Sequence, residues 1–311
     1  MYTRCADPSG RYYVQYAFSY EHSTAVTNGA DSSTNISAFR IKGAHLVKLS
    51  GISDAAVSYQ QIVRVLGDGE ISLAIKESRS DYTVQDFIGG FHGDEHVTDF
   101  SLLADGVSYT PGAEGKKVVA CSELVIHQTS VLDRWEEGLG ADGKKEQVLE
   151  HDQIFTVDRN GISVDRTLTW LVSDFEINAA YPMMFTLQRV TDSTGTAPVC
   201  EIVDIYDANG ARLGGAVTDL SYAKQLNHLS YASGREARYS SATSGVSAKA
   251  GVKNLSGVSV AETFIASRPK LDNKWYVKMV SAKNGNKPVS GEAWSLTCYY
   301  QIDYTTPDTQ K

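Results

Sequence analysis

The feature that most constrains the fold is an alternation of apolar and polar residues with period two, which recurs along the whole chain. The clearest runs span residues 11–18, 37–42, 70–76, 118–127, 153–157, 162–171, 184–188, 200–206, 274–280 and 293–302. Turn signals separate most of them, for example Asp68-Gly69, Asp105-Gly106, Asn160-Gly161 and Asn209-Gly210. Many short strands with Gly-rich turns predict an all-β protein, a large antiparallel β-sandwich or jelly roll rather than a βαβ fold.

Departures from this pattern are few. Helical spacing is confined to Ser53–Leu66 and Ser130–Gly138, where a turn or two of helix is expected. The alternation weakens in Tyr231–Gly257, which is rich in Ser, Ala and Gly. We therefore expect a main sandwich domain over 1–230, an excursion or linker over 231–257, and C-terminal strands over 258–311 that complete the same sandwich. The stretch 231–257 has three interpretations: a mobile lid, a linker to a small C-terminal unit, or a poorly patterned pair of strands. No fixed-period repeat indicates a propeller or a solenoid.

Composition excludes some classes of partner. Hydrophobic residues make up 42% of the 311 residues, which is enough for a real core. The formal net charge of −8 argues against a nucleic-acid backbone or an anionic membrane surface as partner, because both require a concentrated basic surface. A local cluster of Arg and Lys can still bind an anionic sugar. The 17 Tyr and 4 Trp suit sugars and protein interfaces, and also suit strands.

The termini and cysteines give expectations about location. The N-terminus has no apolar stretch typical of a signal peptide, and no run of about 18 apolar residues indicates a membrane-inserted helix. We expect a protein made in the cytoplasm that acts on a virion or a cell exterior if a larger particle carries it there. Cys5, Cys121, Cys200 and Cys298 form no CxxC pair, so buried reduced thiols are expected rather than a structural zinc site.

The segment Gly89–His96 has the highest density of chemically active side chains. If it is extended, His92, Asp94 and His96 share one face and Glu95 points to the other. That face can hold a divalent metal ion through His92, Asp94 and His96. Alternatively Asp94 can fix the tautomer of a catalytic His92. A polar turn that bonds its own backbone is the third interpretation.

A second candidate group lies in the strand Cys121–Ser130. Both faces of this strand mix polar and apolar residues, as is typical of a strand that lines a cleft, so His127 and Gln128 are candidate ligand contacts. A solvated edge strand is the alternative. Asp94 or Glu95 with Glu123 is the first pair to test as glycosidase-type carboxylates.

The third group is Arg166, Tyr181 and Arg189. Arg166 shares a strand face with apolar residues, so it is expected to be stacked, paired or placed at a site. A tyrosine and an arginine near a histidine can abstract the proton α to a uronate carboxylate and neutralise that carboxylate, as a polysaccharide lyase does. A surface ion pair or a stacking contact is the alternative for each residue.

Gly89-Gly-Phe-His-Gly-Asp-Glu95 and the late strand Ser295-Leu-Thr-Cys-Tyr-Tyr-Gln-Ile302, in a tyrosine-rich all-β chain, resemble the receptor-binding proteins of bacteriophage tail fibres and tailspikes. The resemblance implies binding, and sometimes cleavage, of bacterial surface polysaccharide. It also implies other virion tail proteins as partners and a homotrimer. The chain departs from the typical fibre because it lacks a long β-helical or coiled-coil shaft.

Three functions therefore stay open at the level of sequence. The first is a glycan-binding virion protein, with shallow sites rich in aromatic residues. The second is a polysaccharide lyase or hydrolase that uses His92, Asp94, Glu95, His127, Arg166 and Tyr181 in one deep cleft. The third is a structural tail component whose histidine-rich segment caps a sheet or lies in an interface.

Overall fold

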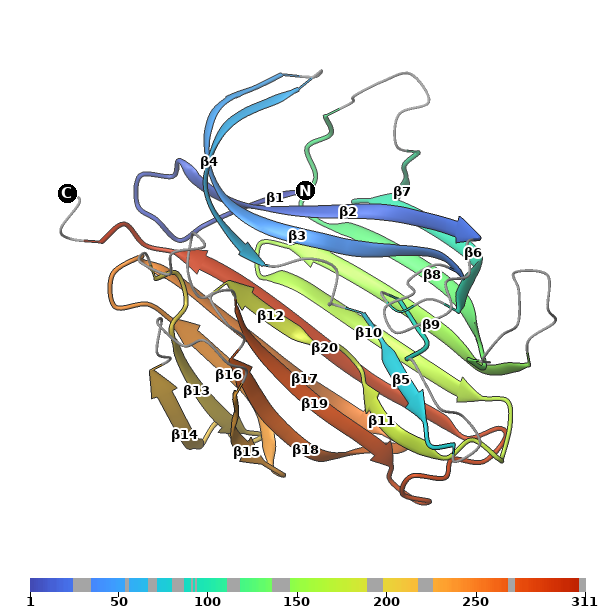
Figure 1. The fold of residues 1–311 in the computed structure, drawn as a ribbon. Coiled ribbons are helices and arrows are strands. Elements are labelled where there is room, and N and C mark those ends of the chain that lie inside the picture. The colour runs from blue at the N-terminus through green and yellow to red at the C-terminus, as the bar shows by residue number, and fades with distance from the viewer. Residues whose placement is uncertain are drawn as a thin grey trace.

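The protein is described by a computed structural model over residues 1–24, 35–53, 56–66, 72–79, 87–90, 92, 94–110, 118–135, 146–188, 198–217, 226–267 and 272–307. Within these ranges all regular structure is β-strand, and the strands number twenty (Figure 1). The predicted all-β, antiparallel sandwich is confirmed. No helix in the described ranges is long and apolar enough to cross a membrane.

The first sheet is antiparallel throughout, and its strands pair in an order that differs from their order in the chain. Across the sheet the strands are β6 (Glu95–Ala104), β8 (Leu124–Asp133), β9 (Gln147–Asp158), β10 (Gly161–Trp170), β20 (Ala293–Tyr304), β17 (Val246–Ser256), β16 (Gly234–Ser240), β13 (Ile202–Asp207) and β14 (Arg212–Val217). The short β7 (Val107–Ser108) pairs with the end of β6. The last strand of the chain, β20, therefore lies in the middle of this sheet (Figure 1).

The second sheet faces the first across the core. Its strands are β1 (Tyr2–Arg4), β2 (Tyr12–Thr24), β3 (Asn35–Ile52), β4 (Val57–Leu66), β12 (Phe185–Gln188), β19 (Asp272–Ser281), β18 (Val258–Ser267) and β15 (Leu226–Tyr231). A small pair, β5 (Ala74–Glu77) with β11 (Ile177–Tyr181), lies beside β19. A short parallel pairing between the starts of β3 and β6 connects the two sheets.

Large aromatic side chains from both sheets meet in the core. The ring of Phe18 on β2 contacts Phe155 on β9 edge to face, with centroids 6.2 Å apart. Phe185 on β12 stacks on Tyr300 of β20 at 6.3 Å. Along β20, Trp294, Leu296, Cys298, Tyr300, Ile302 and Tyr304 are buried while most residues between them are partly exposed. The period of two in the sequence thus becomes one core face and one outer face.

Two of the predicted turns have the geometry that their residues favour. Asp105 and Gly106 both have positive φ, 49° and 77°, as a type I′ hairpin turn between β6 and β7 requires. At the Asn160-Gly161 turn between β9 and β10, Gly161 has φ 107°, and a Cβ there would lie 2.3 Å from the carbonyl oxygen of Tyr300. Asp68-Gly69 lies outside the described residues.

The two helical expectations are wrong in the residues that the structure describes. Residues 57–66 form β4, and the start of Ser130–Gly138 belongs to β8. β4 pairs along its length with β3, and β8 is hydrogen-bonded on both sides, to β6 and β9. Ladder hydrogen bonds on both sides outweigh a weak local preference for helix.

Residues 231–257 are a paired part of the first sheet and not a linker. They contain β16 and nearly all of β17, which lie between β13 and β20. The small residues that weaken the pattern there, such as Ala248 and Ala250, are buried against neighbouring tyrosines. Strands from 258–311 pair with strands from both earlier parts. The division of the chain into domains stays a prediction.

Candidate functional site

Glu95 and Arg166, which the sequence places in separate candidate groups, belong to one buried polar network. Glu95 begins β6, Arg166 lies in β10, and His151 of β9 connects them. Their exposed fractions are 1%, 2% and 1%, respectively. Nδ1 of His151 lies 2.8 Å from Oε1 of Glu95, and Nη1 of Arg166 lies 2.7 Å from Nε2 of His151.

These neighbours fix the protonation state of His151. A guanidinium has no acceptor, so Nη1 of Arg166 donates to Nε2, which must carry a lone pair. The ring proton therefore sits on Nδ1 and is donated to Glu95. Burial lowers the pKa of His151, Arg166 adds to this effect, and Glu95 opposes it. His151 is thus a neutral imidazole between a carboxylate and a guanidinium.

The carboxylate of Glu95 has three donors. Ser130 Oγ donates to Oε1 at 2.7 Å, and the amide of Gly90 donates to Oε2 at 2.5 Å, in addition to His151. Burial by itself raises the pKa of Glu95, but His151, Gly90 and Ser130 together outweigh it and hold the pKa at about 2. The amide of Gly90 can approach Glu95 this closely because residue 89 is a glycine. A Cβ at position 89 would lie 2.6 Å from the carbonyl oxygen of Leu73.

This network has a structural rather than a chemical role. It ties β6, β8, β9 and β10 together inside the sandwich, and its three charged or titratable members are sealed from solvent. A ligand cannot touch Glu95 or Arg166 in this arrangement, so the structure does not place them where their predicted catalytic roles require. The sequence left three possibilities for Arg166, namely stacking, pairing or a place at a site. The structure shows it paired with His151.

The extended conformation expected for residues 92–96 is not found. Asp94 has φ 55°, and the amide of His92 donates to the carbonyl oxygen of Gly89 at 2.8 Å in a turn. The strand begins only at Glu95, so His92, Asp94 and His96 do not share one face. Nε2 of His96 lies instead 3.3 Å from Oδ2 of Asp133.

The residues predicted to hold a metal ion are therefore not gathered by the structure. Among the described residues, no group of three or more His, Cys, Asp or Glu side chains is placed to bind one. The predicted set of metal ligands requires the side chains of an extended segment to alternate between two faces through Gly93, which lies outside the described residues. The positive φ of Asp94 breaks that alternation, because it reverses the direction of the chain immediately before β6.

His127 lies on the outer face of β8. Its Nε2 is 3.1 Å from Oδ2 of Asp152 on β9, and the two side chains are 38% and 45% exposed. Gln128 points the other way, into the core, where its Oε1 accepts a hydrogen bond from the amide of Phe39 at 2.7 Å. His127 is therefore accessible to a ligand but separated by a sheet from Arg166.

The carboxylates proposed as a glycosidase pair lie at opposite ends of β6 and β8. Glu95 pairs with Leu132, whereas Leu124, next to Glu123, pairs with Ala104. Nine residues of strand correspond to roughly 30 Å, far more than the ~5–10 Å that such a pair needs. Glu123 cannot act with Glu95, or with Asp94 beside it, on one sugar.

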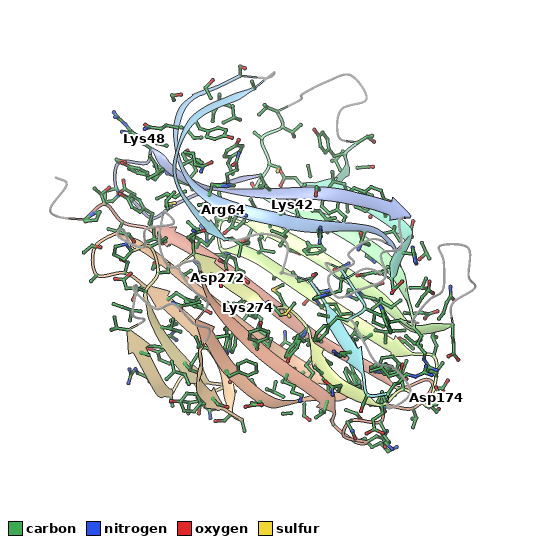
Figure 2. All side chains as sticks on the ribbon, in the orientation of Figure 1. Lys42, Lys48, Arg64, Asp174, Asp272 and Lys274 are labelled. Carbon is green, nitrogen blue, oxygen red and sulfur yellow. The ribbon has the colours of Figure 1, made fainter. Side chains whose placement is uncertain are left out.

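His92 and Tyr181 belong to a row of aromatic side chains on the second sheet. The ring of Phe87 lies 4.9 Å from His92 and 6.0 Å from Tyr181, and Tyr181 lies 5.2 Å from Tyr276. Tyr276 stacks on Phe264 at 4.7 Å. Figure 2 labels Lys274 next to Asp272 on β19, and Nζ of Lys274 is 4.8 Å from the ring of Tyr276.

Tyr181 is unsuited to act as a base at neutral pH. Burial, with smaller contributions from Tyr276 and Glu262, raises the pKa of Tyr181 to about 12. Its partners are the rings of Phe87 and of Tyr276 on β19, while Arg166 is inside the core and His127 is on the first sheet. Of the predicted site residues, this row brings together His92 and Tyr181 alone. Arg189 lies outside the described residues.

The structure also shows a groove that sequence reasoning did not find, on the outer face of the first sheet. A hollow of about 400 Å³ opens over β10, β20, β17 and β16. A second hollow of about 260 Å³ continues it toward the end of β20. The two share Lys249 and Gln301 in their lining, so we treat them as one groove, the β17–β20 groove.

Tyr299 forms the floor of this groove. It pairs with Gly251 across β20 and β17, and Gly251 pairs in turn with Glu236 on β16. A Cβ on Gly251 would lie 2.2 Å from the hydroxyl oxygen of Tyr299 and 2.3 Å from its Cζ. The ring therefore lies across Gly251, and its hydroxyl donates to Oε2 of Glu236 at 2.5 Å. The phenolic end of the ring thus covers the glycine, and Tyr299 also lines the hollow.

Charged side chains surround this ring. Nε of Arg238 donates to Oε1 of Glu236 at 2.6 Å, and the guanidinium of Arg238 lies over the ring of Tyr206, 3.8 Å from its centroid. Nζ of Lys253 is 5.4 Å from the centroid of Tyr299. Burial, followed by Glu236, raises the pKa of the Tyr299 phenol, which thus stays protonated at neutral pH. The groove offers a flat apolar face with polar groups around it.

The sequence could not reveal this site. Tyr299 is one of many tyrosines in alternating runs, and Gly251 belongs to the stretch rich in Ser, Ala and Gly where the strand pattern is weak. Their pairing depends on the register between two strands that are about fifty residues apart in the chain. A glycine opposite an aromatic residue becomes visible only when that register is known.

Comparison with known proteins gives no family for this chain. No protein-family model matches the sequence, and no curated protein matches it. Among solved structures, a variant of a glycoside hydrolase family 97 enzyme from a Pseudoalteromonas strain has 12% identity and a TM-score of 0.40, over 96% of this chain and 35% of that one. A galactose mutarotase-like protein from Clostridium acetobutylicum has 8% identity and a TM-score of 0.42, over 93% and 99% of the two chains. The chain thus spans about a third of the length of the former. At these TM-scores the likeness defines neither the family nor the activity of this chain.

Proposed function

We propose that this protein is a glycan-binding β-sandwich protein and that the β17–β20 groove is its binding site. The observation that carries the proposal is the ring of Tyr299, whose phenolic end lies over Gly251 at the floor of an open hollow of about 400 Å³. A sugar presents one face of C–H groups, which packs on an aromatic ring, and a rim of hydroxyls, which need hydrogen-bond partners. The volume falls within the ~300–1,000 Å³ that ligand sites occupy.

The lining of the groove supplies such partners around the ring. Ser163 and Asn160 lie on the β10 side, and Gln301 and Lys249 lie along β20 and β17. Amide, hydroxyl and ammonium groups can donate to or accept from sugar hydroxyls in several orientations. A tyrosine that covers a strand glycine also stabilises a sheet, so binding and stability must be measured separately.

A bacterial surface polysaccharide is the glycan class that we propose. This part of the proposal, like placement on a phage tail with other tail proteins and assembly as a homotrimer, rests on the resemblance of the sequence to tail-fibre receptor-binding proteins. Native mass spectrometry of the purified chain tests the trimer directly. A monomer at micromolar concentration would contradict it.

The test of the binding site compares two substitutions at one position. Affinity electrophoresis against a panel of soluble neutral and acidic polysaccharides first identifies a glycan that retards the wild-type protein. Tyr299→Ala removes the stacking surface, and we expect at least a tenfold loss of affinity, which corresponds to ~1.4 kcal/mol. Tyr299→Phe keeps the ring and loses only the bond to Glu236, so it should bind within about threefold of wild type.

Tyr59→Ala is the matched control. Tyr59 is 41% exposed on β4 of the second sheet, so Tyr59→Ala removes the same type of side chain at a position outside the groove. Its affinity should equal that of wild type. Retention of binding by Tyr299→Ala would exclude the groove, and failure of every glycan in the panel to bind wild type would contradict the proposed function.

A further inference from the structure

We infer that the β17–β20 groove selects sugars that carry a negative charge, and that Lys249 and Lys253 recognise this charge. The inference rests on the proposed function, because it names the class of sugar that the same groove accepts. Both lysines are exposed and line the hollow whose floor is Tyr299. The relevant ligand is a polysaccharide with acidic sugar residues, such as a polyuronate.

The two lysines flank the ring of Tyr299. Lys249, Gly251 and Lys253 occupy alternate positions of β17, so all three face outward, and Gly251 in the middle lies under the ring. The Cα atoms of the two lysines are separated by about 13 Å of strand, with the ring between them. An acidic sugar stacked on Tyr299 would therefore have an ammonium group on each side along the strand.

The carboxylates of the groove are already occupied by other partners. Asp158 accepts from the backbone and side-chain amides of Asn160 at 2.6 and 2.9 Å, within its own turn. Glu236 accepts from Arg238 and Tyr299. Asp303 accepts from the backbone amides of Ala6 and Tyr304 at 2.8 and 2.7 Å.

In the part of the chain that the structure describes, the lysines have no such partner. Within the described residues, no carboxylate lies within ion-pair distance of Lys249 or Lys253, and Lys253 contacts the Tyr299 ring alone. The lining contains three cations and three anions, but Arg238 and the three carboxylates are engaged. The two lysine ammonium groups are therefore the cations of the described lining that lack an ion-pair partner, and they lie on either side of the Tyr299 ring.

An anionic sugar fits the groove better than the other common polyanions. Nucleic acid presents phosphates at high density and requires an extended basic surface, whereas the whole chain has a net charge of −8. An acidic peptide has no flat face that would use the ring of Tyr299. One stacking surface between two lysines matches one charged ring of a polysaccharide.

The experiment compares polygalacturonate with the same polymer after methyl esterification, which removes the charge and keeps the sugar backbone. At about 50 mM NaCl, wild type should bind polygalacturonate at least about tenfold more tightly than the ester, and the difference should shrink at about 500 mM NaCl because salt screens exposed charges. Lys249→Gln with Lys253→Gln should abolish the preference, so that polygalacturonate and its ester bind this variant with equal affinity. The matched control is Lys48→Gln with Lys278→Gln, which removes the same charge from β3 and β19 of the second sheet and should retain the preference.

The outcomes separate the two proposals. Equal binding of the polymer and its ester by wild type would overturn the charge selectivity and leave glycan binding intact. Binding of neither polymer, with no other acidic polysaccharide bound, would overturn the selectivity, and a panel without any ligand would overturn the proposed function as well. Polyglutamate or single-stranded DNA that binds as tightly as polygalacturonate would show simple ion exchange and would contradict recognition of a sugar.

Discussion

At the scale of single residues, the neighbours of a side chain decide its chemistry more than its type does. His151 and His127 lie on adjacent strands, and each is close to a carboxylate. His151 is sealed between Glu95 and Arg166 and is held neutral, whereas His127 forms a half-exposed pair with Asp152. The alternating pattern singles out His127, whereas His151 lies just before the run 153–157, and its carboxylate partner Glu95 is 56 residues away in the chain.

The first prediction concerns these two histidines. His151→Ala leaves Glu95 and Arg166 buried without their bridge, so we expect a loss of ~3–5 kcal/mol in the free energy of unfolding. His127→Ala removes a surface pair and should change it by less than ~1 kcal/mol. Urea denaturation of both variants measures the difference. Equal effects for the two substitutions would show that the buried network contributes nothing beyond a surface contact.

At the scale of elements, the strands and several turns could be predicted from the sequence, but their partners could not. The period of two identifies β8, β9, β10 and β20, and Asp105-Gly106 identifies a hairpin. In β17 the small residues Ala248, Ala250 and Gly251 weaken the sequence pattern of a strand. In the structure they pack against neighbouring tyrosines. Long-range register is what places β20 beside β17, and no local pattern encodes it.

The second prediction concerns the contact between these two strands. Gly251→Ala introduces a Cβ where the ring of Tyr299 now lies, so the ring must lift from the sheet. We expect a loss of glycan affinity of about tenfold or more, with a change in unfolding free energy of no more than ~1–2 kcal/mol. Gly43→Ala on β3 is the control, because its nearest new contact would be at 3.4 Å. Unchanged affinity in Gly251→Ala would mean that the flat ring is not required.

At the scale of the whole molecule, two sheets with a shared core leave two outer faces for function, and the candidate residues divide between them and the core. His127 and the groove lie on the first sheet, His92 and Tyr181 lie by the second, and Glu95 and Arg166 lie inside. The sequence could identify these residue types and the fold class. It could not show that these residues lie far apart, because the register of a strand decides which face of the sheet each of its side chains points to.

The third prediction concerns the pH dependence of stability. The folded-state pKa of His151 is lowered, so below about pH 6.5 the unfolded chain binds a proton that the folded protein excludes. Glu95 acts in the same direction between about 4.5 and 2, because its folded pKa is also lowered. Stability should therefore fall as the pH drops through 6.5 and continue to fall below 4.5. Thermal melts from pH 4.5 to 7.5 should show a smaller pH slope for His151→Ala than for wild type, and equal slopes would contradict a neutral buried His151.

The most direct test of the account is a crystal structure of the protein with a short oligogalacturonide. We expect one sugar ring to lie over the exposed face of Tyr299, with its carboxylate within ~4 Å of Nζ of Lys249 or Lys253. A sugar bound instead to the aromatic row of Phe87, Tyr181 and Tyr276, with the β17–β20 groove empty, would contradict it.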